Sequence, residues 1–282
     1  MVRAQQVTDP IAYHAEGPVW STAWGGLRWV DMLAGDVLAL GADQSVTRRH
    51  VGSVVAAVRP RSGGWAVLAL ERGFAVEAVD GSVQPYGEVW TDAGVRMNEG
   101  GCDPDGRFYC GSMAYDQRDG AASVYRLDPD GRVQTVLRGV SVSNGLDWSP
   151  DGTRAFYNDT ATHRIDVFDY LDGELVARRP FVDLSSEDAS PDRLVVDSEG
   201  GVWTALNGQG EARRYDHTGR LSEVVELPVD QVTACTLGGP DLDELYLTTS
   251  REGLDADEQP LAGSLFRAPV GVRGLPTRQF AG

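Results

Sequence analysis

The chain has 282 residues, of which 41% are hydrophobic and 8% aromatic, so its composition supports a buried core and excludes a disordered chain. Its net charge of −17 opposes binding to nucleic acid or to an anionic membrane surface, because both carry phosphate charge. No stretch approaches the roughly 18 apolar residues of a transmembrane helix, and the N-terminus has no apolar signal core, so we expect a cytoplasmic protein.

Short runs rich in Val, Leu, Tyr, Trp and Phe follow turn sequences along the whole chain, and convincing amphipathic helices are absent. Six of these runs predict strands that start every roughly 38–47 residues: 27–30, 65–70, 107–110, 154–157, 201–205 and 244–249. Such a period is typical of the blades of a β-propeller.

A further strand, a Gly-containing turn and an outer strand follow most of these runs, as at 123–128 and 133–137. We therefore predict an all-β fold, a six-bladed β-propeller with four antiparallel strands per blade, as a single domain over residues 1–282. An N-terminal strand at Gln6–Ala12 is expected to close the last blade, around 264–281. The longest irregular segments are predicted to be loops at the mouth of the channel: 114–122, 183–191 and 250–262.

The three cysteines, Cys102, Cys110 and Cys235, form neither a metal-binding spacing nor a disulfide framework. Cys102 and Cys110 flank the turn at 103–106, so we expect them on neighbouring strands. Reduced thiols favour a reducing compartment, in agreement with the expected cytoplasmic location.

Polar residues recur at one place in four of the six units. Glu16, Asn98, Asn144 and Asp192 lie 9–11 residues before the equivalent position of the following strand. In a propeller this is the start of each innermost strand, so these side chains converge at one end of the channel. Carboxylate and amide oxygens suit Ca²⁺, Mg²⁺ or Mn²⁺ and can hold Zn²⁺. An Asn or Asp before Gly is also a common turn former, so periodicity alone leaves both interpretations open.

A run of motifs in fixed order carries a more specific signal. The motifs lie at 16–20, 96–100, 143–152, 191–192, 196–203, 227–230, 233–239 and 245–250. In this order they resemble the senescence marker protein / gluconolactonase / luciferin-regenerating enzyme family, over about residues 12–282. The resemblance implies a six-bladed propeller and a lactonase-type hydrolase of carbohydrate metabolism that acts on a sugar lactone or similar cyclic ester.

The resemblance also assigns residues. It implies one divalent metal ion (Ca, Zn, Mg or Mn) bound by Glu16, Asn144 and Asp192. Arg96 and Asn98 match positions that contact the substrate, and Asp116 lies near an acidic substrate contact in a loop that aligns loosely. We expect a monomer or small homo-oligomer whose partner is a small molecule.

A metal at this place would polarise the lactone carbonyl and activate a water molecule, and Asp192 is the expected general base. Three alternatives stay open: a propeller that binds a cation or metabolite without catalysis, a related esterase or phosphotriesterase, and a rearrangement of an unusual substrate. A serine hydrolase is disfavoured, because Ser143 has no Gly-x-Ser-x-Gly context and the histidines lie outside the aligned positions. His14, two residues from Glu16, is expected to be a satisfied strand or rim histidine; the alternative is that it approaches the channel.

Two positions depart from the family pattern, which usually has Gly at 193 and Asp at 99. Here Arg193 and Glu99 stand in their place. The Arg193 side chain is expected to point outward to solvent; the alternative is a positive charge beside the metal that helps to bind an anionic substrate. Because of these two departures, the sequence does not determine which substrate the protein binds.

Overall fold

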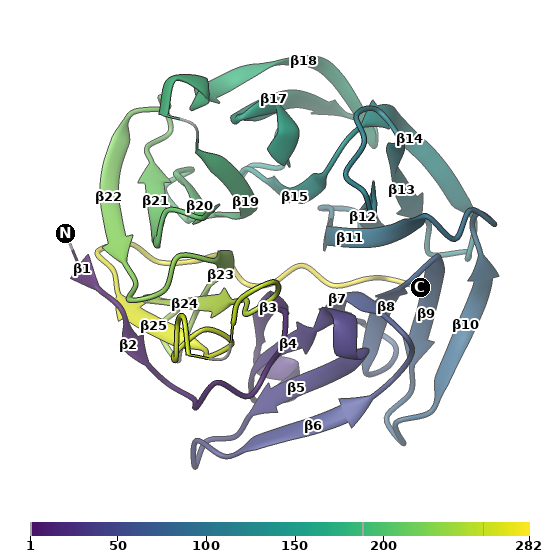
Figure 1. Cartoon of the computed structure of the whole chain (residues 1–282). Helices are drawn as coiled ribbons and strands as arrows, with labels where there is room; N and C mark the ends of the chain where they lie inside the picture. Colours follow the sequence, from purple (N-terminus) through teal and green to yellow (C-terminus); the bar gives the residue numbers. More distant parts are fainter. Residues whose placement is uncertain (1, 188, 256) are drawn as a thin grey trace.

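The computed structural model describes residues 2–187, 189–255 and 257–282. These residues form six β-sheets arranged as a ring around a central channel (Figure 1). The chain is thus nearly all-β, and the predicted six-bladed β-propeller with antiparallel four-stranded blades is confirmed. We number the blades 1 to 6 from the blade that begins with strand β3 (Ala15–Ser21).

Each blade is a meander whose first strand lies innermost and whose last lies on the outside. The strands of blades 1 to 3 are β3 Ala15–Ser21, β4 Gly26–Asp31, β5 Asp36–Leu40, β6 Val46–His50, β7 Val55–Pro60, β8 Ala66–Leu70, β9 Gly73–Glu77, β10 Val83–Glu88, β11 Val95–Cys102, β12 Phe108–Ala114, β13 Ala122–Leu127 and β14 Val133–Val140. Those of blades 4 to 6 are β15 Ser143–Trp148, β16 Arg154–Asp159, β17 Arg164–Leu171, β18 Glu174–Asp183, β19 Ser190–Val196, β20 Val202–Asn207, β21 Glu211–Tyr215, β22 Leu221–Glu226, β23 Val232–Gly238, β24 Glu244–Thr249 and β25 Phe266–Pro269. Short 3₁₀ turns lie at η1 Thr22–Trp24, η2 Met32–Ala34, η3 Thr160–Thr162 and η4 Ser185–Glu187.

The N-terminal segment closes the ring. Strand β2 (Gln5–Gln6) pairs antiparallel with β25 and supplies the fourth strand of blade 6. The closing strand was expected at Gln6–Ala12, so its position was placed too late in the sequence. The preceding strand β1 (Val2–Arg3) adds a parallel fifth strand to the outer edge of blade 5, which the sequence did not indicate. The N-terminus therefore ties two neighbouring blades together.

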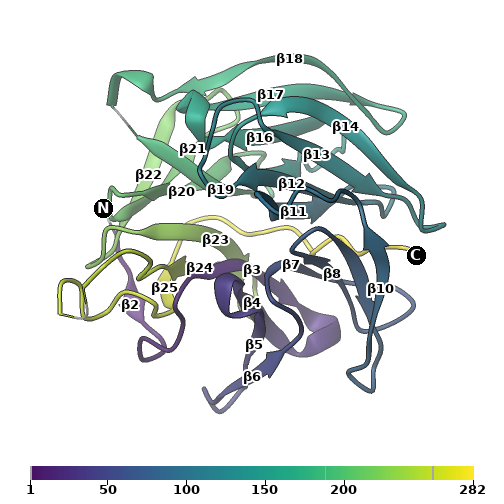
Figure 2. The ribbon, with the colours of Figure 1, turned by 45° about the vertical axis from the view of Figure 1, so that its right-hand side comes forward.

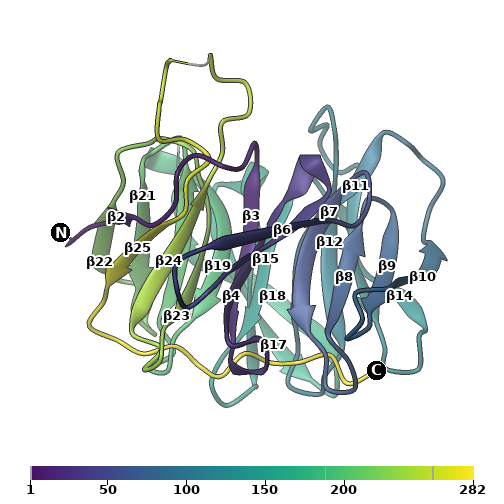
Figure 3. The same ribbon diagram turned by 90° about the horizontal axis from the view of Figure 1, so that it is seen from below.

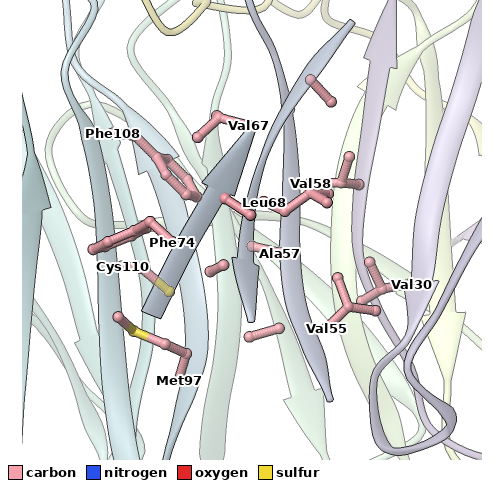
Figure 4. Packing of buried hydrophobic residues seen from close by; sticks show 14 of the residues in the cluster. Val30, Val55, Ala57, Val58, Val67, Leu68, Phe74, Met97, Phe108 and Cys110 are labelled. Carbon is pink, nitrogen blue, oxygen red and sulfur yellow. The ribbon is translucent and has the colours of Figure 1, made fainter. Parts of the chain in front are cut away.

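Apolar faces of neighbouring blades pack against one another. One cluster joins blades 1, 2 and 3, with Val30, Leu68 and Phe108 fully buried in it (Figure 4). Cys102 and Cys110 lie on the adjacent strands β11 and β12, as predicted, and all three cysteines are buried and free. Burial of such side chains on both faces of each blade is the main stabilising contribution to the ring.

The innermost strands share an irregularity that positions the candidate site. In every blade, the pairing between the innermost strand and its neighbour shifts register, which marks a β-bulge. The shifts lie between Glu16 and Val19, Val55 and Ala57, Met97 and Gly100, Ser143 and Gly145, Pro191 and Leu194, and Val232 and Ala234. A regular strand points consecutive side chains to opposite faces, whereas a bulge re-aims them. The polar residues identified by the repeat lie at these bulges.

The C-terminal segment crosses one end of the channel. Figure 2 shows it passing across the ring, and Figure 3 shows that it runs along the end opposite to the loop that follows β24. Phe280 is fully buried in the cluster of blades 1 to 3 and pairs with Arg61. The backbone N–H of Ala281 donates to Gly106 O at 2.9 Å. The channel is therefore closed by the chain at this end.

Within the ranges that the structure describes, no helix has the length and apolar character needed to span a bilayer.

Candidate active site

A polar cavity of about 270 Å³ lies at the open end of the channel. Its walls come from blades 1, 3, 4 and 5 and from loops between strands. The lining residues are His14, Glu16, Arg96, Asn98, Met113, Gln117, Val142, Asn144, Thr160, Ser190, Asp192, Asn207 and Glu252. The three segments predicted as loops at the mouth contribute Gln117, Ser190 and Glu252, one each.

Glu16, Asn144 and Asp192 are brought together in this cavity from blades 1, 4 and 5. Their exposed fractions are 3%, 6% and 5%, so all three are withdrawn from bulk solvent. The bulge in blade 1 depends on Gly17, whose φ of +56° favours glycine. Local backbone geometry thus directs each side chain into the channel.

Hydrogen bonds hold the two carboxylates, Glu16 and Asp192, in place. Asp192 accepts hydrogen bonds from the backbone N–H of Arg193 at 2.9 Å and from Asn207 Nδ2 at 3.2 Å. Glu16 Oε2 accepts one from the Gly17 N–H at 3.1 Å. Glu16 Oε1 faces His14 Nε2 at 3.9 Å, beyond hydrogen-bonding distance. Each carboxylate therefore keeps acceptor capacity toward the cavity.

The two carboxyl groups are hard to ionise where they stand. Burial is the main cause that raises the pKa of Asp192 to about 8, and repulsion from Glu99 adds to it. The hydrogen bonds that Asp192 accepts from Asn207 and from the Arg193 N–H act in the opposite direction. Burial and then repulsion from Asp192 and Glu99 raise the pKa of Glu16 well above its usual value. Both shifts have the causes expected of anionic groups gathered in a poorly solvated site.

These features fit a divalent cation. Across the described ranges, no three His, Cys, Asp or Glu side chains gather as a metal site, so the candidate set consists of two carboxylates and the amide oxygen of Asn144. Asn144 Nδ2 donates to Thr160 Oγ1 at 2.7 Å, which directs Oδ1 the other way. Three oxygens with two negative charges are suited to a dication and leave positions for water and substrate.

Arg96 and Asn98 form a connected pair beside this set. Arg96 Nη1 donates to Asn98 Oδ1 at 2.7 Å and contacts Met32 Sδ at 2.9 Å. Asn98 Nδ2 in turn donates to Asn144 Oδ1 and to Ser143 O. These hydrogen bonds connect the predicted substrate-binding residues, Arg96 and Asn98, to Asn144, the uncharged residue among the three candidate metal ligands.

Asp116 is not brought into the cavity. Its side chain is exposed and pairs with Arg118 Nη1 at 3.0 Å, and hydrogen bonds from Arg118 lower its pKa. The neighbouring Gln117 lines the wall instead. The sequence placed the correct loop at the mouth but could not give the direction of each side chain.

Sequence reasoning missed Thr160 and Asn207, which bond the candidate ligands of their blades. The repeat does contain a signal for this type of residue. Asp31, Asp159 and Asn207 each lie 15 residues after the candidate ligand of their blade, at the end of its second strand. Asp159 accepts the backbone N–H groups of Ser141 and Val142, and Asp31 accepts the corresponding groups of blade 1. Aligning the ends of the second strands would have found Asn207, and Thr160 directly follows the aligned Asp159.

His14 lies in the cavity wall rather than on the rim. Its Nδ1 is 2.8 Å from Ser250 Oγ, and burial followed by the charge of Arg96 lowers its pKa to about 3. Ser250 is 1% exposed, and its Oγ accepts the backbone N–H of Glu252. This serine is held within the fold and is absent from the cavity lining, so the pair does not present a nucleophile.

The expectation that Arg193 points outward was wrong. The side chain is 90% buried, and Nη1 lies 2.8 Å from Glu99 Oε1 inside the channel. The physical reason is the bulge between Pro191 and Leu194, which directs both Asp192 and Arg193 inward where a regular strand would separate them. The two departures from the family pattern are thus paired with each other.

Comparison with known proteins identifies the family. A family model described as SMP-30/Gluconolactonase/LRE-like region matches residues 14–251. The chain belongs to this family. Regucalcin from Oryctolagus cuniculus is 36% identical over 100% of this chain and 99% of its own length.

Solved structures of the SMP-30/gluconolactonase/LRE-like family share the full propeller. The calcium-binding protein regucalcin from Agrobacterium tumefaciens has a TM-score of 0.91 at 27% identity, covering 99% of this chain and 97% of its own. A luciferin-regenerating enzyme has a TM-score of 0.90 at 27% identity and covers 100% of both chains. The resemblance inferred from the motifs is therefore confirmed.

Proposed function

We propose that this propeller is a metal-dependent lactonase that opens the ring of a sugar lactone. The observation that carries the proposal is the pair of buried carboxylates, Glu16 and Asp192, which face the same polar cavity as the Asn144 amide. Neither carboxylate lies within 4.0 Å of an Arg or Lys nitrogen in the described part of the chain. Buried carboxylates without such a partner are suited to a cation supplied from outside.

The size and chemistry of the cavity support a hydroxylated ring as the substrate. Its volume of about 270 Å³ lies just below the roughly 300–1,000 Å³ of sites for drug-sized ligands. Arg96, Asn98, Gln117 and Asn207 offer donors that can hydrogen-bond hydroxyl or carbonyl oxygens. Glu252 adds an acceptor at the mouth.

A bound dication would supply Lewis-acid polarisation of the ester carbonyl and favour deprotonation of a nearby water. Glu16, Asn144 and Asp192 are the residues that would hold it. The positive charge also favours the ionised forms of both carboxylates, which reverses the raised pKa values of the metal-free site.

In this mechanism Asp192 acts as the general base. It takes a proton from the attacking water, whose oxygen bonds to the carbonyl carbon. The ring C–O bond then breaks, and the leaving alcohol oxygen receives the proton that Asp192 held. Asn207 and the Arg193 N–H hold the carboxylate in place, and Arg96 and Asn98 orient the substrate.

A screen of sugar lactones tests this function. Ring opening releases an acid, so a pH indicator reports turnover, and each lactone is offered with Ca²⁺, Mg²⁺, Mn²⁺ and Zn²⁺ in turn. We expect hydrolysis of at least one lactone, at a rate that depends on the metal. The related regucalcin from Agrobacterium tumefaciens is described as a calcium-binding protein, which favours cation binding without catalysis as the second candidate. Tight metal binding without turnover of any lactone would support that second function and contradict the first.

A further inference from the structure

Below the candidate active site, a second polar cluster crosses the channel. Arg59, Glu99 and Arg193 come from the innermost strands of blades 2, 3 and 5 and are 2%, 2% and 8% exposed. Glu99 Oε1 accepts hydrogen bonds from both Arg59 and Arg193, the latter at 2.8 Å. One carboxylate is therefore shared by two buried guanidinium groups.

A small cavity of about 60 Å³ lies on the far side of this cluster, between it and the C-terminal segment. Arg59, Arg193 and Arg278 contribute to its wall together with Asp147. Residues 275–278 of the crossing segment form part of its wall. This cavity is separate from the one that contains Glu16 and Asp192.

Positive charge exceeds negative charge around this lower cavity. Arg59 and Arg193 share Glu99, and Arg278 Nη1 lies 3.4 Å from Asp147 Oδ1. Three guanidinium groups against two carboxylates leave one positive charge. The pKa of Arg59 is lowered to about 10, first by burial and then by the charge of Arg193, in agreement with incomplete compensation.

The guanidinium of Arg193 also has unused hydrogen-bonding capacity. Arg59 donates to three backbone carbonyls as well as to Glu99, and Arg278 donates to Trp148 O and Ser149 O. Arg193 Nε, in contrast, is buried and meets no acceptor among the described residues. A buried donor on a charged group without an acceptor is unfavourable and points to a missing ligand.

We infer that the lower cavity is a binding site for one small monovalent anion of the size of chloride, held by Arg193. The cavity volume is several times the roughly 10–15 Å³ needed for one water and is too small for a sugar or a nucleotide. Thr236 adds a hydroxyl group to the wall, whereas the hydroxyl of Thr277 donates to Trp20 O. Since Glu99 Oε2 is also without a donor, a water molecule is the competing occupant.

Bromide identifies the occupant directly, because its anomalous scattering distinguishes it from water. Crystals of the full chain grown in sodium bromide are expected to show a peak in the lower cavity beside the guanidinium group of Arg193. In solution, thermal unfolding in sodium chloride is compared with unfolding in sodium methanesulfonate at equal ionic strength. We expect a higher Tm in chloride.

Charge variants provide the controls. Arg193→Gln should weaken halide binding at least about tenfold and remove the chloride-dependent Tm difference, whereas Arg193→Lys should retain part of it. Glu99→Gln removes the shared carboxylate and should strengthen halide binding. Water alone in the cavity, or equal Tm values in both salts, would overturn the inference. A bromide peak without any chloride effect in solution would indicate an adventitious ion only and would also overturn it.

Discussion

Replacing Asp192 by Asn is expected to lower kcat/KM for a sugar lactone by at least about 10³-fold while the propeller stays folded. The substitution keeps the size of the side chain but removes both the charge offered to a dication and the ability to accept a proton. Stability should not suffer, because the buried carboxyl is disfavoured in the metal-free site, where its pKa is raised to about 8. Indicator assays with metal present, and circular dichroism for the fold, provide the measurement.

Asp116→Asn is the matched control. It makes the same chemical change in an exposed side chain that pairs with Arg118 outside the cavity. Its kcat/KM should stay within about twofold of the parent value. If Asp192→Asn retained a tenth of the activity, or if Asp116→Asn were equally inactive, the assignment of the general base would fail.

The stability of the metal-free protein is expected to fall as pH rises from about 4 to about 8. The pKa of Asp192 is about 8 in the folded chain against an ordinary value of 3.8, so the folded state holds a proton that the unfolded state has lost. The free energy of unfolding then decreases across this window, and the raised pKa of Glu16 acts in the same direction. Below pH 4 the loss is absent, and above pH 8 it is complete.

A dication that binds the ionised carboxylates should cancel this loss. Urea unfolding with EDTA and with added metal, from pH 5 to pH 9, is the measurement. Metal should raise the free energy of unfolding little at pH 5 and most at pH 8–9. Asp192→Asn should flatten the dependence of the free energy of unfolding on pH in the metal-free protein. A metal effect of equal size at every pH would contradict the charge balance assigned to this site.

The repeat in the sequence carries most of the architecture. A period of turns and apolar runs is sufficient to predict six blades, since each blade buries its faces against its neighbours. The same alignment places Glu16, Asn144 and Asp192 at equivalent positions, and the ring brings them into one cavity. Equivalent positions of the blades converge because the blades are related by rotation about the channel axis. This convergence can therefore be predicted without knowing individual contacts.

What the sequence could not give depends on local backbone detail. Arg193 was expected to face solvent, but the bulge turns both Asp192 and Arg193 inward, where consecutive residues of a regular strand would alternate. Asp116 shows the converse case, in which the loop was located but its side chain faces solvent. The C-terminal segment that contains Phe280 crosses the channel only once. A feature that does not repeat gives no periodic signal in the sequence, so this crossing could not be predicted from the repeat.

The two ends of the channel carry side chains of opposite charge. The upper cavity gathers Glu16 and Asp192 and is suited to a dication with a polar substrate. The lower cluster gathers Arg59 and Arg193 around Glu99 and is suited to an anion. Opposite charge at the two levels of one channel is electrostatically favourable, since each bound ion reduces the repulsion that its neighbours experience.

Metal dependence is the most direct test of the central claim. Protein treated with EDTA and freed of chelator is assayed against the best lactone of the panel, before and after the metal is returned. The account predicts a loss of at least about 100-fold on stripping and recovery on addition of metal. Hydrolysis by the stripped protein at the rate of the loaded protein would contradict it.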